Sequence, residues 1–263
     1  PLGSASVAVD RLYAFSLAEL PVPLELMCPG WDPADHGPVP CGTILAHAPE
    51  GWFLFDVGLS VDFRQETVHR DLFVWGPPLL PGGGDPLLDA LADCGVGLDD
   101  LSAVVLSHLH NDHTGGLRHL AGRSIPVLVQ QDEIDAVARG EGGPFVRAAD
   151  WEPYGVRLTG IHGETPIATG ITAIPSPGHT AGHQSFLIRL ASGCTLLFAY
   201  DAVPLTGNVE RGVATGIIAG DAGQALASQR LLIARAEQEG ARLVPGHCPR
   251  AWAELEGPPA FLC

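Results

Sequence analysis

The chain has 263 residues, of which 46% are hydrophobic and 17% are charged. This balance is typical of a compact enzyme and excludes a disordered or fibrous chain. All 14 basic residues are arginine, and against 30 acidic residues they leave a formal charge of −16. Because lysine is absent from the sequence, a Schiff-base lysine and a phosphate-loop lysine are excluded. The negative charge also argues against nucleic acid and anionic membrane as partners.

The cysteines and the start of the sequence bear on where such a protein works. Six cysteines are scattered along the chain without a Cys-x-x-Cys pair, and we expect reduced, mostly buried thiols. The sequence has no positively charged start followed by an apolar run, and no run of membrane-spanning length. Residues 1–4 resemble the remnant of a cleaved affinity tag. We expect residues 5–263 to form a single domain of a cytoplasmic protein, and we leave its oligomeric state open.

The first 84 residues predict short strands around a long loop. Strand-like runs lie at 7–17, 43–47 and 52–57, the last two as a hairpin. The proline-rich stretch 21–40 predicts a loop that is long enough to face a substrate. The irregular segment 61–84 carries five large apolar side chains, Phe63, Leu72, Phe73, Val74 and Trp75. Such a cluster can line an apolar pocket, but by default we expect it to pack under a loop.

Helices alternate with strands from residue 85 onward. Asp85 and Pro86 predict the cap and first turn of a helix that ends at Gly95. Strands are expected at 103–106, 126–129, 171–174, 185–190, 195–199 and 242–244, and helices at 114–120, 132–139 and 221–240. This alternation, without repeats of solenoid period, predicts an α/β fold in which helices cover sheets.

A dense group of histidines follows the strand expected at 103–106. The run from Ser107 to Gly116 reads Ser-His-Leu-His-Asn-Asp-His-Thr-Gly-Gly. A single His or Asp stands just past a strand at three later places, which are His179, Asp201 and His247. Loops at strand ends hold ligands on a rigid frame, so all four places are candidate metal-binding loops.

These loops supply five histidines and two aspartates, namely His108, His110, Asp112, His113, His179, Asp201 and His247. The set is larger than one tetrahedral zinc ion needs, and it lacks thiolate. It fits two divalent metal ions about 3.5–4 Å apart that share a carboxylate. Imidazole with carboxylate suits zinc best, and iron, manganese or cobalt follow the same ligand chemistry.

Four motifs resemble the metallo-β-lactamase superfamily, and within it the N-acyl homoserine lactonases that degrade quorum signals. They are His-Leu-His-Asn-Asp-His-Thr-Gly-Gly, Ser-Pro-Gly-His-Thr-Ala-Gly-His, the Asp201 that follows an apolar run, and Pro-Gly-His at 245–247. The likeness extends from Arg11 to His247. It implies a four-layer αββα sandwich and a quorum-quenching hydrolase, in which a hydroxide between two metals opens a small lactone or ester.

The resemblance also implies a role for each residue. One metal would be held by His108, His110 and His179, the other by Asp112, His113 and His247, and Asp201 would bridge them. Asp112 would pass a proton to the leaving oxygen. Asp56 would support the metal loop from behind, and His183 would either do the same or be an ordinary hydrogen-bonded core histidine. The remaining histidines are expected at the surface or in structural contacts: His36, His47, His69, His119 and His162.

Two positions depart from the lactonases that the chain resembles. Those enzymes carry a tyrosine three residues after the bridging aspartate, where this chain has Pro204. The residue between the second histidine and the first aspartate of the motif is Asn111 and not an aromatic residue. Tyr200 is expected to face away from Asp201 if the strand alternates regularly. These changes favour one alternative, a tailoring hydrolase or thioesterase that acts on a secondary-metabolite intermediate.

Other classes fit less well. A β-lactamase of the superfamily would carry Cys or Ser at position 201 and an export signal. A thioester hydrolase of the glyoxalase II kind would have a basic C-terminal region, and a tRNA-processing nuclease would be less acidic. A binding protein without activity would not need an open centre for two metals.

Overall fold

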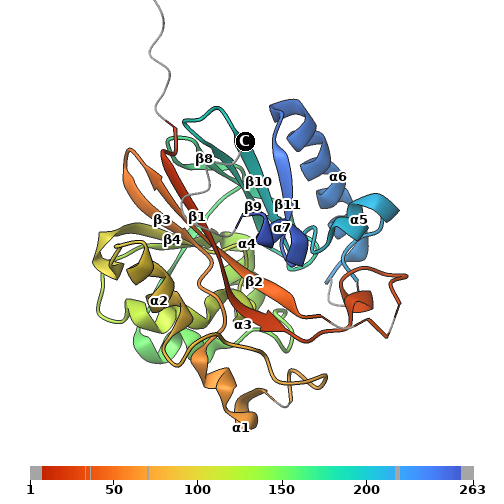
Figure 1. The fold of residues 1–263 in the computed structure, drawn as a ribbon, viewed down its shortest axis with the longest axis horizontal. Helices are drawn as coiled ribbons and strands as arrows, with labels where there is room; N and C mark the ends of the chain where they lie inside the picture. The colour runs from red at the N-terminus through yellow and green to blue at the C-terminus, as the bar shows by residue number, and fades with distance from the viewer. Residues whose placement is uncertain (1–7, 33, 36, 70, 217–219, 256–263) are drawn as a thin grey trace, which may run out of the picture.

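The computed structural model describes residues 8–32, 34, 35, 37–69, 71–216 and 220–255, so the expected tag remnant lies outside the described part. Two β-sheets pack face to face, and helices cover the outer side of each sheet (Figure 1). The α/β, four-layer αββα sandwich predicted from the sequence is therefore confirmed.

The two sheets divide the chain into an earlier and a later half. The first sheet contains β1 (Arg11–Leu20), β2 (Val39–Ala48), β3 (Gly51–Phe55), β4 (Leu101–Val105), β5 (Val127–Gln130) and β6 (Leu158–Ile161), in that spatial order. The second sheet has the order β11 (Arg242–Pro245), β10 (Thr195–Tyr200), β9 (Gln184–Arg189), β8 (Ile171–Pro175) and β7 (Thr165–Ala168). The pairs from β3 to β6 and the pair β10–β11 are parallel, and the others are antiparallel.

The helices are short, with one exception. The α-helices are α1 (Glu66–His69), α2 (Pro86–Asp93), α3 (Asn111–Thr114), α4 (Gln131–Ala138), α5 (Thr206–Arg211), α6 (Ala222–Glu239) and α7 (Pro249–Ala253). The 3-10 helices are η1 (Leu24–Leu26), η2 (Val61–Arg64), η3 (Leu98–Asp100), η4 (Gly115–Leu120), η5 (Ala148–Asp150) and η6 (Glu152–Tyr154). Across the described ranges, no helix combines the length and apolarity needed to cross a membrane.

Successive side chains of the central strands alternate between two cores, one between the sheets and one under the helices. On β10, Phe198 and Tyr200 face the core between the two sheets, whereas Leu197 and Ala199 face the opposite side. That opposite side packs against Leu232 of α6, and in Figure 1 this helix lies along β10 and β11. Because neighbouring side chains of a strand point to opposite faces, one strand contributes to two separate cores. The ends of such doubly buried strands are rigid supports for loops.

Local signals place the two helices that the sequence delimits best. The Asp85 side chain accepts a hydrogen bond from the Leu87 N–H group at 3.1 Å, so it caps α2 as predicted. Asp221 caps α6 in the same way through the N–H group of Gln224, at 2.9 Å. Gly240 ends α6 with a φ of 59°, a conformation that glycine adopts without strain.

Several elements differ from the expectation. The short helix expected at 114–120 begins at Asn111, because the His113 N–H group already bonds to the His110 carbonyl oxygen at 3.0 Å. Asp112 and His113 therefore lie on a helical turn and not in an open loop. Elements without a sequence prediction include α1, β7, α5 and α7. Each is six residues or shorter, which is too short for a hydrophobic period to be read.

Candidate metal centre

A buried carboxylate organises the start of the histidine loop. Asp56 follows β3 with a φ of 55° and is fully buried. Its Oδ1 accepts the N–H group of Ser107 at 2.7 Å, and its Oδ2 accepts the Ser107 hydroxyl at 2.7 Å. Both contacts tie Ser107, the second residue after β4, to the neighbouring parallel strand, so the loop leaves the sheet in a fixed direction.

The structure brings all seven predicted side chains together. Their donor atoms form three overlapping groups, in each of which the atoms lie within 4.8 Å of one another. The groups are His108, His110 and His179; His108, His113 and Asp201; and Asp112, His113 and His247. They meet at the ends of β4, β8, β10 and β11, where the two sheets come together.

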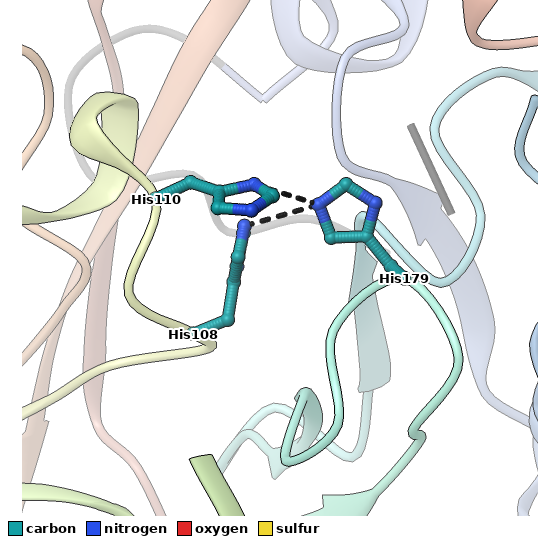
Figure 2. Close-up of side chains that lie close together, drawn as sticks. All are labelled: His108, His110 and His179. Carbon is teal, nitrogen blue, oxygen red and sulfur yellow. Dashed lines mark hydrogen bonds between the residues drawn. The ribbon is translucent and has the colours of Figure 1, made fainter. Parts of the chain in front are cut away.

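Three imidazoles form the first part of the cluster. The Nε2 atom of His179 lies 3.2 Å from Nε2 of His108 and 3.0 Å from Nδ1 of His110 (Figure 2). His108 and His110 come from one loop, and His179 approaches from another (Figure 2). Burial lowers the pKa of His108 and His179 well below the usual value, and lowers that of His110 to about 4. All three rings are therefore neutral at pH 7, which is the state that binds metal.

The second part of the cluster combines two imidazoles with a carboxylate. Nε2 of His113 lies 3.4 Å from Oδ2 of Asp112, and Nε2 of His247 lies 3.8 Å from the same oxygen. Burial would lower the pKa of His113, but Asp112, Asp56 and Asp201 together raise it well above the usual value. Burial raises the pKa of Asp112, but the adjacent His113 outweighs it, so this pKa falls to about 2.

Asp201 lies between the two parts. Its Oδ2 is 3.2 Å from Nε2 of His179, and its Oδ1 is 3.0 Å from Nε2 of His247 and 3.5 Å from Nε2 of His113. Burial would raise the pKa of Asp201, but these histidines, His247 first, hold it well below the usual value. One ionised carboxylate thus presents an oxygen to each side, as the predicted bridging residue requires.

The donor set fits divalent cations. Nε2 of His113 and Oδ1 of Asp201 are buried and have no hydrogen-bond partner in the protein. Buried polar atoms without partners are costly, and a bound cation would satisfy both. Carboxylate and imidazole donors are the ligands that zinc takes in catalytic sites.

Contacts behind the cluster fix which ring nitrogen faces it. Nδ1 of His113 donates to Oδ2 of Asp56 at 2.7 Å, and Nδ1 of His247 donates to the carbonyl oxygen of Pro40 at 2.8 Å. Nδ1 of His108 donates to the Ser107 hydroxyl oxygen at 2.9 Å. In each ring Nε2 is therefore the nitrogen that faces the centre, an orientation typical of metal-binding histidines.

His183 holds Asp201 in place and belongs to none of the three groups. Its Nε2 accepts the Asp201 N–H group at 3.2 Å, so its Nδ1 carries the proton and donates to Ser176 Oγ at 2.9 Å. Ser176 in turn donates to Ser185 at 2.7 Å, and Ser185 donates to the Ala199 carbonyl oxygen at 3.0 Å. Of the two sequence interpretations, support from behind the centre describes this histidine better. Burial lowers the pKa of His183 to about 3, so it stays neutral.

The other histidines lie away from the cluster where they are described. His47 contacts Asp10 at 2.6 Å, and His119 contacts Asp85 at 2.8 Å. His162 is exposed. His36 and the side chain of His69 fall outside the described part of the chain.

A cavity with apolar walls opens onto the centre. Its floor includes His110, Asn111, Asp112, His179, Asp201 and His247. Its walls include Val22, Leu26, Met27, Leu72, Phe73 and Trp75. The proline-rich segment thus faces the site, as expected. The default expectation that segment 61–84 only packs under a loop was wrong for three of its residues, because Leu72, Phe73 and Trp75 line the cavity.

The two departures from the lactonase pattern have clear positions. Pro204 is buried, and its carbonyl oxygen accepts the His247 N–H group at 2.8 Å. Tyr200 is buried in the core between the sheets, where its hydroxyl donates to the Phe55 carbonyl oxygen at 3.3 Å. Neither side chain lines the cavity. Asn111 does line it, and its side-chain nitrogen is buried without a partner in the protein.

Comparisons with known proteins agree with this geometry. The family model of the metallo-beta-lactamase superfamily matches residues 36–247. The N-acyl homoserine lactonase AttM of Rhizobium johnstonii is 32% identical over 242 residues, which cover 85% of this chain and 87% of AttM. The N-acyl homoserine lactonase AiiA of Bacillus thuringiensis subsp. kurstaki is 29% identical over 175 residues, which cover 65% of this chain and 67% of AiiA.

Solved structures give the same result. A mutant of B. thuringiensis AiiA with N-decanoyl-L-homoserine at its active site superposes with a TM-score of 0.82 at 25% identity. That match covers 93% of this chain and 95% of the AiiA chain. The resemblance seen in the sequence motifs is confirmed, and the chain belongs to the metallo-beta-lactamase superfamily.

Proposed function

We propose that this protein is a metal-dependent hydrolase that opens the lactone ring of N-acyl homoserine lactones. The observation that carries the proposal is the position of Asp201 between two groups of donors on the floor of a cavity with apolar walls. The names of the similar proteins support the same reaction class.

The donors are arranged for two divalent cations, for which zinc is the best match to imidazole and carboxylate. His108, His110 and His179 would hold one, Asp112, His113 and His247 the other, and Asp201 both. Bound there, the pair would lower the pKa of a water to near neutrality and would polarise the carbonyl group under attack.

Asp112 is the residue that we assign to proton transfer. Its side chain is 12% exposed, more than the 4% of Asp201, and it lines the cavity. The pKa of about 2 keeps it ionised, so it can accept a proton from the attacking water and return it to the leaving alkoxide. The acyl–oxygen bond breaks, water supplies a hydroxyl group to the acyl carbon and a proton to the leaving oxygen, and the product is a hydroxy acid.

The cavity supports an acyl substrate. Its walls are built by apolar side chains in and around η1 and by Leu72, Phe73 and Trp75. An acyl chain in contact with them would gain about 0.8 kcal/mol for each buried methylene group. We therefore expect affinity to rise with chain length until the walls are covered.

Turnover with and without a chelator tests the proposal. N-acyl homoserine lactones of several chain lengths, simple esters and thioesters are supplied, and acid release is followed with a pH indicator. We expect lactone opening that a chelator abolishes and zinc restores. Activity that survives complete chelation, or no activity on any of these substrates, would contradict the proposal. A preference for thioesters would favour the tailoring-hydrolase alternative.

Metal content provides a second measurement. Elemental analysis of protein purified without chelator should give about two metal ions per chain. Asp201→Ala should lose at least one ion, whereas Asp132→Ala, a change at an exposed position of α4, should lose none. A wild-type content of zero would refute the centre itself.

A further inference from the structure

A buried glutamate outside the cluster joins two of its loops. Glu133 lies near the start of α4 and is 1% exposed. Its Oε1 accepts the N–H group of Leu109 at 3.0 Å, and its Oε2 accepts the N–H group of Gly182 at 2.8 Å. Nothing in the sequence distinguishes this residue, because an acidic side chain in the first turn of a helix is common.

The two N–H groups belong to the loops that carry the three-histidine part of the cluster. Leu109 stands between His108 and His110, and Gly182 follows His179 by three residues. The first loop leaves β4 of one sheet, and the second leaves β8 of the other. A single carboxylate therefore connects loops from both sheets. The connection lies next to the point where Nε2 of His179 is 3.2 Å from Nε2 of His108.

Close packing at Gly182 gives independent support. A Cβ atom at this position would lie 2.1 Å from the backbone nitrogen of Glu133 and 2.6 Å from its Cα atom. No side chain fits there, so the His179 loop can rest directly on the first turn of α4. The short contact places the Gly182 N–H group within reach of the carboxylate.

The two hydrogen bonds to the Glu133 carboxylate can hold the loops at a fixed distance from each other. Hydrogen bonds from N–H groups to an ionised carboxylate are about twice as strong as those between neutral groups. Burial raises the pKa of Glu133, and the N–H groups of Gly182 and Leu109 act in the opposite direction by stabilising the charged form. Each carboxylate oxygen serves a different loop, so removal of one acceptor releases one loop and leaves the other held.

We propose that Glu133 is a positioning residue for the cation held by His108, His110 and His179, because its carboxylate sets the distance between the two loops that carry them. This inference rests on the metal-binding role proposed above for these histidines. Glu133 acts through backbone N–H groups, and it touches neither the cation nor the substrate. Removal of the carboxylate should weaken the binding of that cation and leave the binding of the other unchanged.

A double-mutant cycle tests this assignment. In a His247→Ala background, where the three-histidine part remains, Glu133→Gln should weaken zinc binding about 10- to 100-fold, the usual effect of losing a group that orients metal ligands. In a His179→Ala background, Glu133→Gln should change zinc affinity by less than about twofold, as expected for independent sites. Competition with a chromophoric chelator gives both values.

Control variants separate positioning from general destabilisation. Asp132→Asn changes an exposed carboxylate on the same helix and should leave both affinities at their wild-type values. Glu133→Asp keeps the charge but is shorter, so it should reach one loop only and show the same selective loss. Thermal unfolding of each metal-free variant measures any loss of fold stability separately, and the absorption spectrum of bound Co²⁺ reports the ligand geometry.

The outcomes are distinct. The inference is supported if a Glu133 variant weakens zinc binding only in the His247→Ala background and alters the Co²⁺ spectrum. If Glu133→Gln does not fold, the same result with Glu133→Asp supports it. Equal weakening in both backgrounds, or wild-type affinity for both Glu133 variants, overturns it. If wild-type protein binds no zinc, the proposed function fails; if wild type binds two ions and the Glu133 variants match it, only the positioning role fails.

Discussion

The Nδ1 atom of His113 lies 2.7 Å from Oδ2 of Asp56, and both side chains are fully buried. The same carboxylate also accepts two hydrogen bonds from Ser107. It therefore orients a candidate metal ligand and the backbone from which the histidine loop starts. The ring nitrogen on the other side of His113 faces Asp112 and Asp201 as a result.

Asp56→Asn should weaken metal binding without loss of the fold. Asparagine tolerates the φ of 55° at this position, but its amide carries no charge to stabilise the Nδ1 proton of His113. We expect metal affinity to fall about 10- to 100-fold, measured by chelator competition. Asp93→Asn, at an exposed position, is the matched control. Unchanged affinity in Asp56→Asn would show that the contact does not tune the ligand.

Gly115→Ala should destabilise the protein through a steric clash. Its φ of −59° is allowed for alanine, but the new Cβ atom would lie 1.9 Å from the backbone nitrogen of Ser60. We expect a loss of about 3 kcal/mol in the free energy of unfolding, measured with urea on metal-free protein. Gly83→Ala has no atom within 4 Å of its new Cβ and should change stability by less than about 0.5 kcal/mol. Equal effects of the two changes would contradict the steric explanation.

His183 should make the metal-free protein less stable in acid. In the folded state its pKa is about 3, whereas in the unfolded chain it titrates near 6.5. Between these values the unfolded state binds more protons, so stability falls as the pH decreases and levels off below about 3.

The expected slope from this one group is at most about 1.4 kcal/mol per pH unit. Unfolding of the metal-free protein by urea at several pH values gives the slope, and His183→Gln should be less steep in this window. Identical slopes for wild type and variant would show that His183 does not titrate as described. The comparison removes the contributions of His108, His110 and His179, whose pKa values are also lowered. His113 and His247 have raised pKa values, so they change stability above about pH 6.5 and not in this window.

Asn111 should contribute to recognition of a polar group on the substrate. Its side chain is 1% exposed, and its amide nitrogen lies buried at the cavity without a partner in the protein. A substrate carbonyl oxygen would satisfy this donor, so Asn111→Leu should lower kcat/KM for N-acyl homoserine lactones about 10- to 100-fold. γ-Lactones of similar length that lack the amide are the control. An equal loss on both substrates would place the contact at the ring and not at the amide.

The sequence predicted the centre better than its surroundings. The seven candidate ligands sit at strand ends, and their residue types alone indicate metal. The segments that build the cavity walls could be indicated but not their residues, because Val22, Met27 and Phe73 come from segments without a hydrophobic period. The spacing role of Glu133 was hidden for another reason: its partner Gly182 lies 49 residues further along the chain, and only the packing of α4 against that loop brings them together. Residue types in short sequence motifs identify the candidate ligands, whereas contacts between distant segments of the chain determine how the ligands are positioned.

The division of the two sheets between the earlier and later halves of the chain has a consequence for biosynthesis. During synthesis, the first sheet with His108, His110, Asp112 and His113 is completed before the strands that lead to the remaining donors. His247 emerges last and is followed in the described part only by α7 and its flanking residues. These four donors cannot complete any of the three donor groups until the later strands dock, because each group includes His179, Asp201 or His247. Assembly of the paired site therefore waits for β11, and a chain that stops before β7 would carry four of the seven ligands without the geometry to use them.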